Sequence, residues 1–302
     1  MQLLAGPLLA PLLVGLVRRT KASLAGRRGD PLLQVYTDLW KLARKGAVYS
    51  RTTTWVFRGG PVVGLSCALA ALTLLPMGGS PGLVAFPGDL LLLAGVLALA
   101  RFAMILAALD TGSAFEGMGA SREAWFGALA EPALLLCLAA LARVAHSGSL
   151  SRIEVALGPG AWAASSGTLA LVSVALLGVL LAENSRIPFD DPATHLELTM
   201  VHEAMVLDHG GPDLAFIELA AALKLWVFAS VLAGLIMPLR TGSAIFDDLA
   251  QIVGIAVIGI ALGVVESTMA RLRLLRVPQL LIGVGVLAIL GVMLASGPGA
   301  PR

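Results

Sequence analysis

The sequence predicts an all-α integral membrane protein with about eight transmembrane helices and an interfacial amphipathic helix. Apolar residues make up 58% of its 302 residues, and charged residues only 13%, roughly half the charged share of a soluble domain. Apolar runs of about 17 residues or more recur along the chain. A soluble protein needs polar residues on every outer helical face, so most of this chain requires a lipid environment.

Eight apolar segments each approach the ~20 residues that cross a hydrocarbon core. They are expected near 2–17, 60–77, 88–109, 124–145, 167–183, 216–238, 248–267 and 278–296. Between the first two, apolar residues at helical spacing lie opposite charged residues that include Asp38 and Lys41, which predicts an amphipathic helix near 31–45. No repeat of whole helical units is visible, so one membrane domain is expected over 1–302.

The distribution of basic residues predicts the orientation of the chain. Ten of the 21 Lys and Arg residues lie between Arg18 and Arg58. With this segment in the cytoplasm, about 15 basic residues lie inside and about 4 outside. The positive-inside rule therefore predicts a multi-pass protein of the cell inner (cytoplasmic) membrane with both termini extracytoplasmic. The acidic loop 183–215 then shares the cytoplasmic face with the basic segment.

Cysteine and histidine usage argues against a cofactor in this chain. Cys67 and Cys137 each lie inside an apolar run without metal-binding spacing, so no iron–sulfur cluster or zinc is expected. His202 and Glu203 begin like the HExxH zinc motif, but Val206 stands where the second histidine is required. The net charge is only +2, and no nucleic-acid partner is expected.

The loop 183–215 is predicted to contain a proton or ion relay. Apolar residues are interleaved with its acids, so we expect it to fold back onto the protein with its carboxylates partly buried; an ordinary solvated loop is the alternative. Burial raises the pKa of an unpaired carboxyl, which lets it exchange protons near neutral pH. The candidate relay residues of this loop are Glu183, Asp190, Asp191, Glu197, His202 and Glu203.

Further ionisable residues lie inside the predicted spans. A charge at mid-depth costs several kcal/mol unless it is paired or hydrated, so such residues are functional by default. We expect a polar axis that extends the relay into the membrane, with a structural ion-pair network as the alternative. The residues of this axis are Arg101, Glu131, Glu218 and Lys224.

The run ENSRIPFD at 183–190 resembles the E-x-x-R-x-P-F-D signature of the H subunit (subunit 1) of respiratory complex I and its relatives in membrane-bound NiFe-hydrogenases. The longer run ENSRIPFDDPATHLELTMVHEAM is most similar to the branch found in formate hydrogenlyase and hydrogenase-4 (component C). The runs GRRGDPLLQVYTDLWKLARK, EGMGASREAWFGALAEPALLL and ESTMARLRLLRVPQLL are also similar to that branch. The resemblance therefore covers nearly the whole chain.

This resemblance implies an eight-helix membrane subunit that anchors a hydrophilic electron-transfer arm and couples its redox chemistry to ion movement. The expected partners are the hydrogenase large subunit and a small iron–sulfur subunit on the cytoplasmic face, antiporter-like membrane subunits and the lipid bilayer. The NiFe centre and the iron–sulfur clusters are expected in those partner subunits. The implied docking and structural residues are Arg186, Pro188, Phe189, Arg27, Arg28, Asp38 and Lys41.

The sequence leaves two other functions open beside this group-4 NiFe-hydrogenase role. A quinone-binding H subunit of a complex I-like NADH dehydrogenase would use the same loops. Those subunits have glycine–phenylalanine, an acid and tyrosine where this chain has Val201, His202, Glu203 and Ala204. A stand-alone secondary transporter would line a substrate path with Arg101, Glu131 and Lys224, but such transporters are commonly built from two similar halves, and none is visible here.

Overall fold

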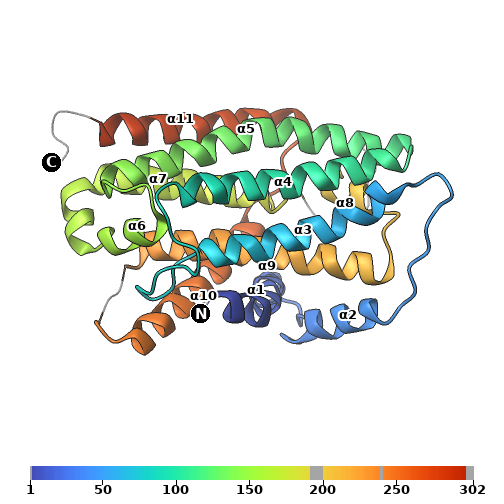
Figure 1. Ribbon diagram of the computed structural model, residues 1–302, viewed down its shortest axis with the longest axis horizontal. Coiled ribbons are helices and arrows are strands. Elements are labelled where there is room, and N and C mark those ends of the chain that lie inside the picture. The colour runs from blue at the N-terminus through green and yellow to red at the C-terminus, as the bar shows by residue number, and fades with distance from the viewer. Residues whose placement is uncertain (1, 191–199, 239–240, 297–302) are drawn as a thin grey trace.

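The computed structural model describes residues 2–190, 200–238 and 241–296, which form helices without a β-strand (Figure 1). Within these ranges eight helices are long and apolar enough to span a bilayer, as predicted. They are α1 (Gln2–Leu24), α3 (Trp55–Leu74), α4 (Asp89–Asp110), α5 (Ala114–Val144), α7 (Pro159–Glu183), α9 (Gly211–Ile236), α10 (Ala244–Thr268) and α11 (Val277–Ala295), the last preceded by the 3₁₀ turn η1 (Leu274–Arg276).

The helices extend beyond the apolar segments that identify them. Helix α5 begins at Ala114 instead of near 124, and α1 continues to Leu24 instead of ending near 17. Residues such as Glu116 and Glu123 interrupt the apolar run, but glutamate is a good helix former. The backbone therefore stays helical past the apolar core of the span.

Local sequence signals explain several helix starts. Helices α7, α9 and α11 have a proline in their first turn, where the missing N–H is not required. At the start of α3, the Thr54 hydroxyl accepts a hydrogen bond from Val56 N at 3.2 Å. Asp110 at the end of α4 accepts from Thr54 N at 2.6 Å. This contact joins the start of α3 to the end of α4.

In the part of the chain that the structure describes, three shorter helices lie at the ends of the bundle: α2 (Gln34–Ala43), α6 (Leu150–Ala156) and α8 (His202–Val206). Helix α2 falls within the range 31–45 expected for the amphipathic helix and lies beside the bundle (Figure 1). Only Val35 is buried in it, whereas Trp40 is 63% exposed. An amphipathic helix with an exposed aromatic residue suits the membrane interface.

The long helices pack closely where small residues meet. A Cβ added to Gly60 of α3 would lie 2.6 Å from Ala107 Cβ of α4, and one added to Gly263 of α10 would lie 2.7 Å from Thr20 Cβ of α1. Such contacts are typical of membrane helices, whose association depends on van der Waals packing.

The bundle has two chemically different ends. The connections 25–54, 111–113, 184–190, 200–210 and 269–273 lie at one end, which we call the charged end. The connections 75–88 and 145–158, with α6, lie at the other, which we call the opposite end. In Figure 1 the charged end is on the right, where the segment 44–54 extends, and α6 is on the left.

Candidate functional site

A network of charged side chains joins four helices inside the bundle. The guanidinium of Arg101 on α4 pairs with Glu131 of α5 and Glu183 of α7. Its Nε also lies 3.4 Å from Glu123 Oε1 on α5. Lys224 of α9 pairs with Glu183, with 2.9 Å between Nζ and Oε2. The network thus contains three acids and two bases, a formal charge of −1 when all five groups are ionised.

The sequence of α5 creates the space that Arg101 occupies. Glu123, Gly127 and Glu131 follow one another at four-residue spacing, which places them on one helical face. A Cβ added to Gly127 would lie 2.6 Å from Arg101 Nη1 and 2.9 Å from its Cδ. The glycine therefore lets the arginine side chain lie against α5 between the two acids.

The centre of the network is buried, whereas the side chain of Glu131 is 39% exposed. Arg101 is 8% exposed and Glu183 is 5% exposed. Isolated charges would be very costly at these positions, so each depends on its oppositely charged neighbours. Because such groups titrate as a coupled set, a proton gained at one carboxylate changes the proton affinity of the others. The arrangement therefore links the ionisation of its three carboxylates through Arg101 and Lys224.

The 186–190 loop, which begins three residues after α7, is held by the end of α10 and by the connection from α10 to α11. Arg186 pairs with Glu266 at 3.0 Å, and Arg271 donates a 2.8 Å hydrogen bond to Asp190 Oδ1. The backbone N–H of Leu272 donates to the carbonyl of Pro188 at 3.1 Å. The loop also contains Phe189, which is only 3% exposed. The loop is thus folded onto the bundle, immediately beyond the charged network.

The basic and acidic segments are in direct contact at the charged end. The ring of His209 stacks on Phe57 of α3 with centroids 3.9 Å apart and planes 6° apart. Gly211 has a φ of +59°, and a Cβ there would lie 2.8 Å from the carbonyl oxygen of Gly46. Burial lowers the pKa of His209 to about 4, so its imidazole is neutral at pH 7.

Other predicted loop residues have different positions. His202 and Glu203 begin α8 and are half-buried, and the His202 backbone N–H donates to Asp190 Oδ2 at 3.2 Å. Asp191 and Glu197 lie outside the described residues.

In the basic segment, Arg27, Arg28 and Lys41 are exposed, and half-buried Asp38 accepts a 2.8 Å hydrogen bond from Gln34.

The structure differs from the expected polar axis at Glu218. It brings Arg101, Glu131 and Lys224 together, but Glu218 lies on an exposed face of α9. No hydrogen bond or ion pair joins it to the network within the described ranges. The reason is helical geometry. Glu218 and Lys224 are six positions apart on α9, so their side chains point about 120° away from each other.

Two acids of these clusters, Glu123 and Glu266, are not among the relay residues predicted from the sequence. Glu123 precedes the predicted start of its span, although its eight-residue spacing to Glu131 places both on one helical face. Glu266 lies near a predicted span end, yet it is 6% exposed and lies 3.7 Å from Lys21 Nζ in addition to its pair with Arg186. The helical spacing could have identified Glu123, whereas only the tertiary contacts identify Glu266.

Fold and site define a multi-pass helical membrane protein with a buried charge network beneath a loop-rich, charged end. The chain belongs to the NADH dehydrogenase subunit 1 family, whose model, described as NADH dehydrogenase, matches residues 1–296. It is 34% identical over 280 residues to formate hydrogenlyase subunit 4 of Escherichia coli (strain K12), with 90% of this chain and 89% of that protein covered. It is 32% identical over 274 residues to hydrogenase-4 component C of the same organism, with 89% of this chain and 85% of that protein covered.

More distant similarities agree with this family. The H subunit of NADH-quinone oxidoreductase from Verminephrobacter eiseniae (strain EF01-2) is 30% identical over 213 residues, which cover 68% of this chain and 58% of that protein. A chain of the membrane-bound sulfane sulfur reductase, an archaeal respiratory membrane complex, superposes with a TM-score of 0.80 over 97% of this chain and 96% of its own, at 20% identity. The structural likeness shows a shared fold, and the resemblance predicted from the sequence motifs is confirmed.

Proposed function

We propose that this chain is the membrane-anchor and ion-coupling subunit of a group-4 NiFe-hydrogenase complex of the formate hydrogenlyase type. Its similarity to formate hydrogenlyase subunit 4 and hydrogenase-4 component C along most of its length supports this choice. The observation that carries the proposal is the continuity between the buried network and the 186–190 loop. Glu183 belongs to the network and Arg186 to the loop, so an event at the charged end reaches the membrane interior within one helical turn.

The charged end is the proposed docking surface. The hydrogenase large subunit and the small iron–sulfur subunit would bind there on the cytoplasmic side, and they would hold the NiFe centre and the clusters. Exposed Arg27, Arg28 and Lys41 offer positive charge next to the acidic loop, which gives a partner two complementary patches. Antiporter-like membrane subunits would cover outward-facing apolar surface, for example around Phe102 of α4, which is 57% exposed.

The proposed relay runs from the charged end into the bundle. Asp190, Asp191, Glu197, His202 and Glu203 would exchange protons beneath the docked arm. From there protons would reach the set of Glu183, Glu131 and Glu123, which pair with the two cations Arg101 and Lys224. Coupling arises because a change of charge in the arm alters the proton affinity of the nearest carboxylates.

The identity of the complex is tested by affinity purification through a tag on this chain, followed by mass spectrometry. We expect a NiFe-hydrogenase large subunit and an iron–sulfur subunit in stoichiometric amounts. Recovery of NADH-dehydrogenase subunits with bound quinone would instead support the complex I-like alternative. Recovery of the chain alone, active in transport, would support the secondary transporter.

The relay is tested with Glu183→Gln and Glu131→Gln in the intact complex. Each variant should keep its partner subunits and lose most proton translocation linked to hydrogen evolution. Glu218→Gln is the matched control, because it changes an exposed acid outside the network. Full coupling in both network variants would contradict the relay.

A further inference from the structure

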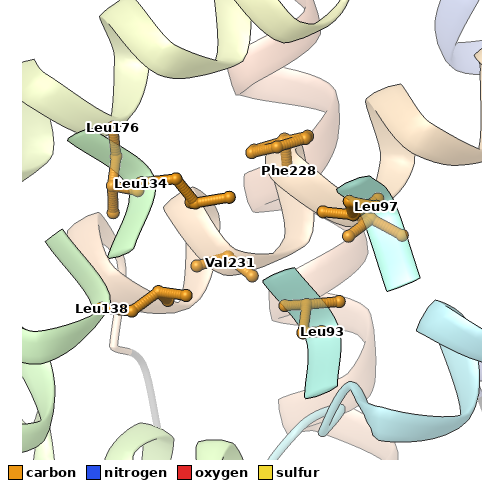
Figure 2. A pocket seen from close by; sticks show the side chains of 8 residues that line it. Leu93, Leu97, Leu134, Leu138, Leu176, Phe228 and Val231 are labelled. Atoms are coloured by element: carbon orange, nitrogen blue, oxygen red, sulfur yellow. The ribbon is translucent and has the colours of Figure 1, made fainter. Parts of the chain in front are cut away.

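An apolar region lies between the charge network and the opposite end of the bundle. One helical turn beyond the network, on the side of the opposite end, α4 presents Leu97, α5 presents Leu134 and α9 presents Phe228. With Leu176 of α7, they surround a cavity of about 10 Å³ whose lining is entirely apolar (Figure 2). A water molecule needs a cavity of about 10–15 Å³ and two to four polar partners, so this cavity excludes water.

A second cavity of about 40 Å³ lies further toward the opposite end. It shares Leu138 and Val231 with the first cavity, but its lining also includes Ser230, Gln251 and Glu154. Gln251 Nε2 donates a 3.1 Å hydrogen bond to Ser230 Oγ. By the same criterion, this volume and polarity suit about three water molecules.

We infer that the charge network is closed toward the opposite end by an apolar seal, with a separate water-holding chamber beyond it. The seal is the layer around Leu97, Leu134, Leu138 and Val231, and the chamber is the cavity that contains Ser230 and Gln251. From Arg101 to Leu93, the far edge of the seal on α4, the distance along the helix is roughly 12 Å. The side chains that line this layer carry no hydrogen-bonding group, so a proton on the network has no path through it to the chamber. Beside the layer, Trp226 donates a 2.8 Å hydrogen bond to Gln2, which donates to Ser230 at 2.9 Å, but an indole N–H only donates and does not relay a proton.

The functional meaning of the seal depends on the proposed relay. A relay that was open at both ends would let protons return across the membrane without redox work. The seal restricts the network to exchange at the charged end or sideways into a neighbouring membrane subunit.

Passive proton flux tests the seal without any turnover. The purified complex is reconstituted into liposomes containing a pH dye, and a pH gradient is imposed in the absence of an electron donor. Val231→Thr adds a hydroxyl with little change in volume, and Leu138→Ala combined with Val231→Thr joins the two cavities. We expect the double variant to raise the flux about tenfold, which corresponds to a barrier lower by roughly 1.4 kcal/mol.

The matched control is Val174→Thr, which makes the same change on α7 at a side chain that is 57% exposed. It should leave the flux at the wild-type level. Assembled complexes of both seal variants with wild-type flux would overturn the seal.

Adding Glu183→Gln to the leaking double variant separates the seal from the relay. Loss of the leak supports both the seal and the relay, because it shows that the leaking protons cross through the network. A leak that persists supports the seal and contradicts the relay.

Hydroxyl-radical labelling with mass spectrometry tests the same arrangement in the wild-type complex. Radicals formed in internal water should label Leu150 and Leu157, which line only the chamber. Leu97 and Leu134 of the seal should remain unlabelled. Labelling of the seal leucines, or none in the chamber, would overturn the inference even if the variants fail to assemble.

Discussion

The ammonium of Lys224 lies 2.9 Å from a carboxylate oxygen of Glu183, so one buried ion pair joins α9 to α7. Glu183 also binds Arg101 of α4 and is the last residue of α7. The 186–190 loop begins three residues later. This one carboxylate thus joins the interior of the bundle to its charged end.

The Lys224–Glu183 pair should show strong energetic coupling. Lys224→Met leaves the network with a formal charge of −2, and we expect it to lower the free energy of unfolding by roughly 3–5 kcal/mol, the usual cost of removing one partner of a buried pair. Combining it with Glu183→Gln restores the formal charge to −1 and should recover part of this loss. A double-mutant cycle of thermal unfolding in detergent measures the coupling, and simple additivity would contradict it.

Gly127 should be required for the position of Arg101. Gly127→Ala places a methyl group against the guanidinium, which has to move away from Glu123 or Glu131. We expect a loss of about 1–3 kcal/mol, typical of overpacking in a closely packed interior. Gly117→Ala on the same helix meets no atom within 4 Å and serves as the control. Equal melting temperatures for the two variants would show that the space at position 127 is not needed.

The bond between Arg271 and Asp190 should control the local stability of the 186–190 loop. Asp190→Asn and Arg271→Ala each remove a charge-assisted hydrogen bond, and backbone amides of the loop and of 269–274 should exchange about tenfold faster. Asp190 also accepts from the His202 backbone, so the double variant should exchange no faster than Asp190→Asn alone. Arg273→Ala, at an exposed position, should leave exchange unchanged. Hydrogen-exchange mass spectrometry measures all four proteins.

His209 should make the charged end sensitive to acid. Burial holds its pKa at about 4 in the folded protein, below the ordinary value of 6.5, so the unfolded chain binds more protons. The contribution of neutral His209 to the free energy of unfolding is therefore complete above pH 6.5. It is lost as the pH falls from 6.5 to 4, which lowers this free energy by up to about 3 kcal/mol.

Thermal unfolding between pH 4 and pH 7.5 measures this effect. His209→Phe keeps an aromatic ring against Phe57 and should flatten the curve in this window. His146→Asn, at an exposed position, is the control and should keep the wild-type pH dependence. An unchanged curve for His209→Phe would rule out His209 as the source.

The sequence alone determined the membrane class, the number of spans, the family and the acids of the 183–190 segment. These properties are local: the length of an apolar run sets a span, and the ENSRIPFD motif is contiguous. Helical spacing also limits which residues share a face, but the predicted span starts at 124 and so excludes Glu123.

The pairing of the charges and the extent of the network depend on how the helices pack in three dimensions. Arg101 and Glu183 are 82 positions apart, and their contact depends on how α4 and α7 are rotated and packed, which neither segment encodes by itself. The same rotation leaves Glu218 exposed while Lys224 faces inward. In lipid every outer face is as apolar as the core, so hydrophobicity does not specify the rotation of each helix; the buried ion pairs and the close glycine contacts do.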